Sequence, residues 1–268
     1  MSAKITNPDC EIALVANYPI PDKFEHLFSE HGIKIVSVPF DNYRVPDTFK
    51  WELAFYKLKV IEYMAEQAEY DFYLGVDTDT YFSGYLDELW EECSSNLPVL
   101  YPLAASPNEP TRKYIRENYK KIFGKDEPII QIGGEFLAGS LQAFQKLADQ
   151  NRFIYNTIRE KDFPISTDSG DEALLSMSAS NFSFLPALPY VRRYWGRKAY
   201  YNVDSAWDHI PIWHLPAEKN YGLDIMYRYI IKKGRLPAPK EAARMFNLPC
   251  QNKYSISMIK YYIYRLLH

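Results

Sequence analysis

The sequence predicts an α/β protein in which a mixed, mainly parallel sheet is flanked by helices and followed by a C-terminal helical extension. Two observations carry this prediction. Apolar segments of strand length alternate with segments whose apolar residues recur every three or four positions, which is typical of helix-covered parallel sheets. The apolar run Phe72–Val76 ends in two carboxylates, Asp77 and Asp79, and ligand sites in open α/β sheets lie at such carboxyl ends.

The first hundred residues justify the alternation. We expect, in order, strand 11–16, helix 23–31, strand 34–38, a long helix opened by Pro46–Thr48, strand 72–76, helix 86–93 and strand 98–101. Gly32 ends the first helix, and Leu53, Tyr56, Val60 and Met64 repeat at helical steps in the second. No Gly-x-Gly-x-x-Gly follows the first strand, so a dinucleotide site of that type is not expected.

The second half continues with less regular signals. We expect a charged surface helix or lid at 108–123, an apolar segment at 129–141, helices at 140–148, 153–160 and 173–177, late strands at 182–185 and 210–214, and an amphipathic tail at 255–267. Glycines within the apolar segment, among them Gly133 and Gly134, indicate close backbone approach or a bulge.

The composition excludes several classes of protein. The 268 residues are 47% hydrophobic and 24% charged, with a net charge of −3, which is ordinary for a soluble globular protein and unlike an electrostatic nucleic-acid binder. No apolar run is long enough to span a bilayer, and no signal pattern opens the chain. Three cysteines, far apart, form neither a disulfide framework nor a zinc pattern. We therefore expect a cytoplasmic protein.

Asp77 and Asp79 are the first candidate ligands. Paired carboxylates at a strand end suit a hard divalent cation such as Mg²⁺ or Mn²⁺, which usually keeps waters and substrate phosphates; the alternative is an ordinary Asp-rich turn. His214 follows an apolar strand, where histidine is often structural, but with the two aspartates it can complete a metal site. Lys219 can then offset phosphate charge.

Two further segments have functional and structural interpretations. Asp168, Asp171 and Glu172 open a helix and either cap it or face a substrate sugar. The segment Arg192–Tyr201 mixes cations with aromatics, so it either holds an anionic or sugar-bearing acceptor or forms a solvated loop with packed aromatics.

The tail has an apolar stripe with basic residues beside it. Ile256, Ile259, Ile263 and Leu266 share one helical face. Such a helix either lies in a membrane interface or docks on the protein body. With the basic Arg192–Lys198 segment, it suggests peripheral association with a membrane that carries a lipid-linked or lipopolysaccharide acceptor.

Three of these segments, taken in order, resemble GT-A-fold retaining glycosyltransferases. Asp77-Thr-Asp79 resembles the Asp-x-Asp metal and nucleotide motif. Residues 133–141 resemble the Gly-Gly-Phe-Phe-Gly-Gly-Ser segment of the blood-group A/B transferase family, although Glu135 departs from it. Residues 170–175 resemble the Asp-Gln-x-x-Leu-Asn of the glycogenin-like and bacterial lipopolysaccharide galactosyltransferase family, and Phe55–Leu58 resembles the Ser-Lys-Leu of its preceding helix.

The resemblance implies a GT-A, Rossmann-like catalytic domain over residues 1–220, with a nucleotide-sugar half at about 1–105 and an acceptor half at about 106–220, followed by a helical extension at 221–268. It implies transfer of a hexose, with retention, from a nucleotide-sugar to a glycan or lipid-linked acceptor, and the families it resembles use a UDP-sugar. The residues implied are Asp77, Asp79 and His214 for Mn²⁺ or Mg²⁺, Tyr18, Lys57 and Lys219 for the nucleotide-sugar, and Glu172 with Asp171 beneath the anomeric carbon.

Two other classes remain as alternatives. A phosphatase of the haloacid dehalogenase type also carries Asp-x-Asp after a strand. There the motif normally follows the first strand and has Thr or Val two places after its second Asp, where this chain has Tyr81. A non-catalytic nucleotide-sugar binding module with the same fold is the second alternative, and turnover of a nucleotide-sugar separates it from an enzyme.

Overall fold

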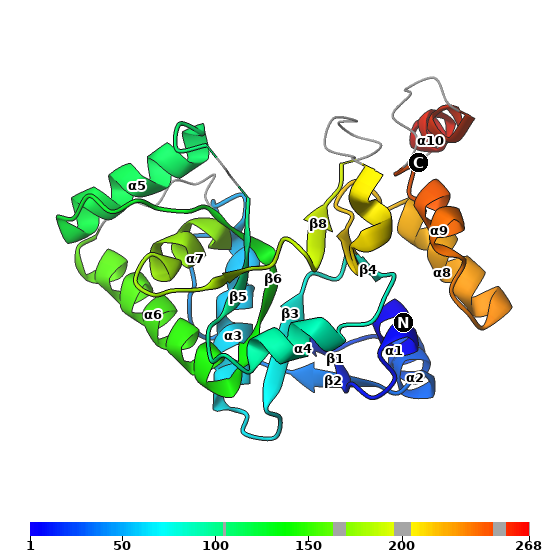
Figure 1. Ribbon diagram of the computed structural model, residues 1–268, viewed down its shortest axis with the longest axis horizontal. Coiled ribbons are helices and arrows are strands. Elements are labelled where there is room, and N and C mark those ends of the chain that lie inside the picture. The colour runs from blue at the N-terminus through cyan, green and yellow to red at the C-terminus, as the bar shows by residue number, and fades with distance from the viewer. Residues whose placement is uncertain (104–105, 163–169, 196–204, 249–255, 268) are drawn as a thin grey trace.

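The computed structural model describes residues 1–103, 106–162, 170–195, 205–248 and 256–267. Helices flank three small sheets (Figure 1). The strands are β1 (Ile12–Ala16), β2 (Ile33–Ser37), β3 (Phe72–Val76), β4 (Thr80–Phe82), β5 (Val99–Pro102), β6 (Ile132–Ser140), β7 (Leu185–Pro186), β8 (Val191–Arg193) and β9 (Ile212–His214). The α-helices are α1 (Ser2–Thr6), α2 (Asp22–Glu30), α3 (Tyr56–Glu66), α4 (Asp87–Cys93), α5 (Pro110–Phe123), α6 (Leu141–Glu160), α7 (Asp171–Ala179), α8 (Gly222–Lys233), α9 (Pro239–Met245) and α10 (Ile256–Leu267).

Strand pairing is mixed across the three sheets, as the sequence predicts, although β1 and β2 form a purely parallel pair. Their strand orders are β1-β2, β3-β6-β5-β7 and β4-β9-β8. Pairs β1·β2, β5·β7 and β8·β9 are parallel, and β3·β6, β5·β6 and β4·β9 are antiparallel. Parallel and antiparallel pairs are equally frequent in the described part of the chain, so the expected predominance of parallel strands is not found. The β3 and β4 sheets meet where the chain leaves β3, at residues 77–79.

The helix expected from Pro46 begins later. Phe49 N donates to Pro46 O, so this segment forms a turn, and a short 3-10 helix (η1, Glu52–Phe55) leads into α3. The buried face of α3 is Leu58, Ile61 and Ala65, whereas Leu53 is exposed. The buried face is therefore offset from the predicted one, of which Tyr56, Val60 and Met64 are only partly buried.

The two helices expected at 140–148 and 153–160 are one continuous helix, α6. Its buried residues include Phe144, Ala148, Asn151, Ile154 and Ile158, which keep helical spacing across the predicted break. No glycine or proline interrupts this segment, so the polar residues between the two apolar stretches do not end the helix.

The other boundaries agree with the prediction within a few residues, except that the late strands shorten to β7 and β9. The short strands β4 and β8 and the N-terminal helix α1 were not expected. One apolar cluster joins side chains on both sides of residue 220: Tyr81, Trp213 and Leu215 pack with Met226 and Phe246. Helices α8 and α9 therefore share a core with the β4-β9-β8 sheet.

Candidate active site

The turn that connects β3 to β4 carries the Asp-x-Asp motif. The backbone carbonyl of Asp77 accepts a hydrogen bond from Thr80 Oγ1 at 2.8 Å, and Leu215 N donates to Asp79 O at 2.9 Å. Asp79 is 3% exposed, whereas the Asp77 side chain is partly open to solvent. These backbone hydrogen bonds fix the turn, so both carboxylates lie at the carboxyl end of β3, as the sequence predicts.

His214 reaches the same place through strand pairing. Strand β9 runs antiparallel to β4, and the register sets His214 opposite Thr80. The Nε2 atom of His214 lies 3.3 Å from Asp79 Oδ1 and 3.7 Å from Asp77 Oδ2. One ligand atom from each of the three residues lies within 4.8 Å of the other two. The structure therefore brings together the three residues that the resemblance implied.

The donor set of this cluster fits a divalent cation. Two carboxylate oxygens and one imidazole nitrogen suit Mn²⁺, and Mg²⁺ accepts the carboxylates with water. Burial alone would raise the pKa of Asp79, but the hydrogen bond and charge of His214, together with Lys219, outweigh it and lower the pKa to about 2. Burial opposes protonation of His214, yet Asp79 and Glu135 hold its pKa above the ordinary value. Asp79 is therefore a buried carboxylate that stays ionised at neutral pH.

Lys57 connects the Asp77 turn with the start of α7. Its Nζ lies 2.8 Å from Asp77 Oδ1 and 3.2 Å from Asp171 Oδ2. Burial alone would lower the pKa of Lys57, but the carboxylates of Asp171 and Asp77 outweigh it and raise the pKa. Gly134 on β6 makes room for this pair, because a Cβ there would lie 2.1 Å from Asp171 Oδ2. The close approach expected of the glycine strand is therefore present.

The two candidate sugar-facing carboxylates differ in environment. Asp171 is 4% exposed and pairs with Lys57. Glu172 is partly exposed, and its Oε1 accepts from Arg193 at 2.7 Å while Oε2 accepts from Gln131 at 3.3 Å. Of the two, only Glu172 has a carboxylate open to the solvent side of the cluster.

Two residues that sequence reasoning did not place in the site are Glu135 and Arg193. Glu135 is 1% exposed on β6, accepts two hydrogen bonds from the Arg193 guanidinium, and lies 3.2 Å from His214 Nδ1. A signal was available, because an acid inside an apolar strand must find a partner. Arg193 lay in a segment considered for acceptor binding, but its guanidinium turns inward to these carboxylates.

The remaining predicted residues lie at the edge of the metal-ligand cluster, away from it, or outside the described residues. Lys219 Nζ lies 3.1 Å from Asp79 Oδ2 and is largely exposed, where it can meet an anionic ligand. Tyr18, just after β1, is 65% exposed, and no contact among the described residues joins it to the cluster. Asp168 and residues 196–201 of the cationic aromatic segment lie outside the described residues.

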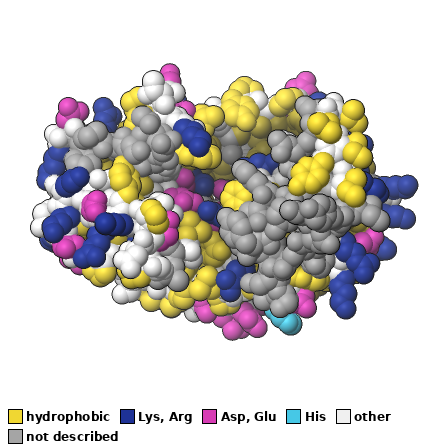
Figure 2. Space-filling view, turned by 90° about the horizontal axis from the view of Figure 1, so that it is seen from above, with side chains coloured by type: hydrophobic (Ala, Val, Ile, Leu, Met, Phe, Trp, Pro, Cys, Tyr) yellow, Lys and Arg dark blue, Asp and Glu magenta, His cyan; other side chains and the backbone are white. Residues whose placement is uncertain are grey.

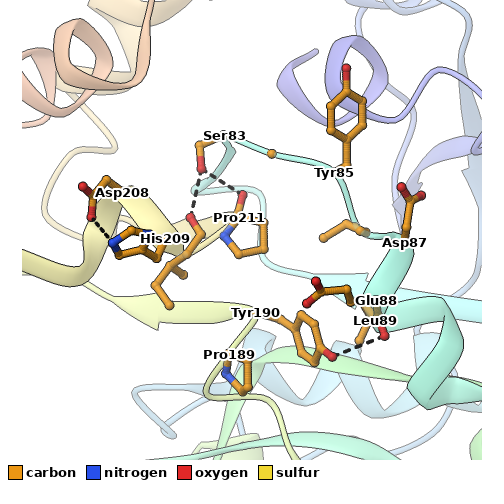
Figure 3. A pocket seen from close by; sticks show the side chains of 13 residues that line it. Ser83, Tyr85, Asp87, Glu88, Leu89, Pro189, Tyr190, Asp208, His209 and Pro211 are labelled. Carbon is orange, nitrogen blue, oxygen red and sulfur yellow. Dashed lines mark hydrogen bonds and ion pairs between the residues drawn. The ribbon is translucent and has the colours of Figure 1, made fainter.

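A separate cavity of about 330 Å³ lies beyond the other end of β4 (Figure 3). Ser83, Tyr85, Glu88, Tyr190 and Pro211 are among the residues that line it. Ser83 Oγ donates to Ile210 O, and Tyr190 Oη donates to Glu88 O, so several of its polar groups are already satisfied by the protein. None of the described residues in the metal-ligand cluster lines this cavity.

Comparison with known proteins places the fold. A crystal structure of an active-site mutant of LgtC resembles this chain with a TM-score of 0.55 and 14% identity, covering 91% of this chain and 92% of that one. The chain has a GT-A fold. A crystal structure of mouse xyloside xylosyltransferase 1 matches at a TM-score of 0.47 and 15% identity, over 76% of this chain and 83% of that one. No family model matches the sequence. No curated protein matches it either.

Proposed function

We propose that this protein is a glycosyltransferase that moves a hexose from a nucleotide-sugar, a UDP-sugar, to a glycan or lipid-linked acceptor, with retention and with dependence on a divalent metal. The observation that carries the proposal is the Asp77–Asp79–His214 cluster at the carboxyl end of β3 in a GT-A fold. A phosphatase of the haloacid dehalogenase type is disfavoured, because it carries Asp-x-Asp after the first strand of the chain, whereas here the motif follows the third strand, β3.

In this proposal the environment of each residue indicates whether it binds the metal or the donor. Asp77, Asp79 and His214 would hold Mn²⁺ or Mg²⁺, which when bound neutralises the charge that develops on a diphosphate leaving group. Lys219 is exposed beside Asp79, which is its one ion-pair partner in the described residues, and would move to contact an anionic phosphate. Tyr18 is exposed at the end of β1, on the nucleotide-sugar half of the fold, and would contact the donor.

The sugar-facing carboxylate in this proposal is Glu172. Its ion pair with Arg193 and its hydrogen bond from Gln131 fix both oxygens while the side chain stays partly exposed. An ionised carboxylate below the anomeric carbon stabilises an oxocarbenium-like transition state, as in glycosidases. Asp171 is buried against Lys57 and would set the position of that lysine and of the Asp77 turn.

The central test is metal-dependent turnover. Asp79→Asn should lower kcat/KM for transfer or hydrolysis of a UDP-sugar by about 10²- to 10³-fold and abolish Mn²⁺ dependence, because removal of an electrostatic stabiliser costs about that much. Asp126→Asn, which removes an exposed carboxylate paired with Arg116, is the matched control and should behave as wild type. Nucleotide-sugar binding without turnover by the wild-type protein would instead favour a binding module.

A comparison of two further variants tests which carboxylate, Glu172 or Asp171, faces the sugar. Glu172→Gln should lower kcat at saturating donor more than it lowers thermal stability. Asp171→Asn removes a buried charge, and its main effect should be on the geometry around Lys57. Near-wild-type kcat in both variants would remove the start of α7 from the chemistry.

We also propose that the protein works at a membrane surface through α10. All five described large apolar side chains of α10 are exposed: Ile259, Tyr262, Ile263, Leu266 and Leu267. They recur at helical spacing on one face, and Lys and Arg side chains gather at the end of the molecule that carries α8 and α9 (Figure 2). None of the helices in the described residues could cross a membrane.

An apolar helical face beside cations suits the interface of an anionic bilayer. A variant ending at Leu248 should lose binding to vesicles of anionic lipid while it keeps transfer to a soluble acceptor analogue. Binding equal to that of the full chain would contradict the membrane role. Docking of α10 on the protein body predicts a different result, a lower melting temperature of the truncated protein.

A further inference from the structure

A buried charged pair links two groups of the proposed active site. Glu135 lies within the apolar strand β6, flanked by Gly134 and Phe136, and is 1% exposed. Its Oε1 accepts from Arg193 Nε at 2.6 Å and lies 3.2 Å from His214 Nδ1. The same guanidinium reaches Glu172 Oε1 at 2.7 Å. One carboxylate and one guanidinium therefore contact both the metal-ligand cluster and the sugar-facing carboxylate.

Such a pair is costly to bury, and stability alone does not account for it. Replacement of a buried ion pair by apolar residues of similar volume is often neutral or stabilising. The chain also gives up a side chain to accommodate Glu135, because a Cβ at Gly133 would lie 2.2 Å from Glu135 Oε2. The location of the pair, between His214 and Glu172, points to a positioning role.

We infer that Glu135 and Arg193 are positioning residues, Glu135 for the metal-facing nitrogen of His214 and Arg193 for the carboxylate of Glu172. This inference rests on the proposed function. A carboxylate that accepts a hydrogen bond from Nδ1–H leaves Nε2, which faces Asp77 and Asp79, as the nitrogen that would bind the cation. The imidazole is thereby held in the tautomer and orientation that a metal ligand requires.

Arg193 performs its part through the shape of its guanidinium. The Nε and one terminal nitrogen bind both oxygens of Glu135, and that terminal nitrogen also binds Glu172. Arg193 is itself placed by β8, whose parallel register sets it beside His214 on β9. A lysine offers a single point charge and cannot make the two-oxygen contact and the third contact together.

The test for Glu135 measures metal affinity directly. Mn²⁺ binding to the full chain is followed by electron paramagnetic resonance of free Mn²⁺, without donor. Glu135→Gln keeps the size of the side chain and should raise the Mn²⁺ dissociation constant about 10- to 100-fold. This is the usual effect of removing the hydrogen-bond partner of a metal-bound histidine.

A matched control separates positioning from stability. Glu62, 5% exposed on α3, is also a buried glutamate paired with an arginine, Arg152 on α6, and it contacts none of the three proposed ligands in the described residues. Glu62→Gln should lower the melting temperature but change Mn²⁺ affinity less than 2-fold. If Glu135→Gln does not fold, Glu135→Asp replaces it; the shorter carboxylate keeps the charge opposite Arg193 but withdraws from His214.

The test for Arg193 is a kinetic one. Arg193→Lys should lower kcat at least about 10-fold while KM for the donor stays within 3-fold, since Glu172 loses its ion pair. Its Mn²⁺ affinity should fall less than that of Glu135→Gln, because the lysine keeps a cation opposite Glu135. Mn²⁺ affinity of Glu135→Gln equal to that of a wild type that binds Mn²⁺ overturns the inference and leaves the proposed function standing. A wild type that binds no Mn²⁺ overturns both.

Discussion

Replacement of Lys57 by methionine tests whether the buried carboxylate of Asp171 depends on its ion pair. Methionine keeps the length and apolar stem of lysine but removes the ammonium that lies between Asp77 and Asp171. Asp77 is partly hydrated and can exchange this contact for water. Asp171 is 4% exposed, so its negative charge would remain in the protein interior without its partner.

The size of the effect follows from that burial. Removal of one partner of a buried ion pair costs about 3–5 kcal/mol, because the other charge stays uncompensated. This is a large part of the total of about 5–15 kcal/mol that stabilises a typical protein. The cost also depends on pH. Burial raises the pKa of Asp171 above its ordinary value, and loss of Lys57 should raise it further. The penalty therefore grows as pH rises above the unfolded-state pKa and is relieved as Asp171 takes up a proton.

The assay is urea denaturation of wild type, Lys57→Met and the double variant Lys57→Met/Asp171→Asn at pH 5 and pH 8, without divalent metal. The single variant should lose about 3–5 kcal/mol at pH 8 and less at pH 5. The double variant should regain most of the loss, since the amide carries no charge. A loss below about 1 kcal/mol at pH 8, or no recovery in the double variant, would refute the assignment of Asp171 as a carboxylate that depends on Lys57.

Two other predictions concern the same region. Gly134→Ala should lower stability by about 1–3 kcal/mol and displace Lys57, because the added Cβ meets Asp171; a crystal structure with an unmoved ion pair and unchanged stability would contradict this. Without metal, stability should fall as pH drops from about 4.5 toward 2, because Asp79 and Glu135 both have folded-state pKa values lowered to about 2. Each of these carboxylates contributes roughly 2–3 kcal/mol above its unfolded-state pKa that is lost as it is protonated. Acid titration of Asp79→Asn should show a smaller loss than wild type.

The sequence predicted the parts of the site that depend on one strand. Asp77 and Asp79 follow an apolar run of strand length, and the structure sets them at its carboxyl end. Gly134 inside an apolar segment indicated close approach, and the Lys57–Asp171 pair fills the space. These inferences succeeded because strand ends and glycines have local meanings that need no knowledge of distant partners.

The parts of the site that depend on pairing between distant segments could not be predicted from the sequence. Strands β4 and β8 each have three residues, too few for a period to be recognised. Their register with β9 brings His214 beside the acids and sets Arg193 next to it. Glu135 could be recognised as a departure from the resembling segment, but only the fold reveals that its partners come from β8 and β9.

The position of the acidic cluster at a seam has a thermodynamic consequence. Asp77 directly follows β3 of one sheet, whereas Asp79 directly precedes β4 and His214 is the last residue of β9 in another. A cation bound by all three is a crosslink between the sheets that forms only when both are folded. By mass action, a ligand at 100 times its dissociation constant adds about 2.7 kcal/mol to the folded state. Because neither sheet alone offers the complete ligand set, this energy couples their unfolding, and the loaded protein should melt in a sharper single transition than the metal-free one.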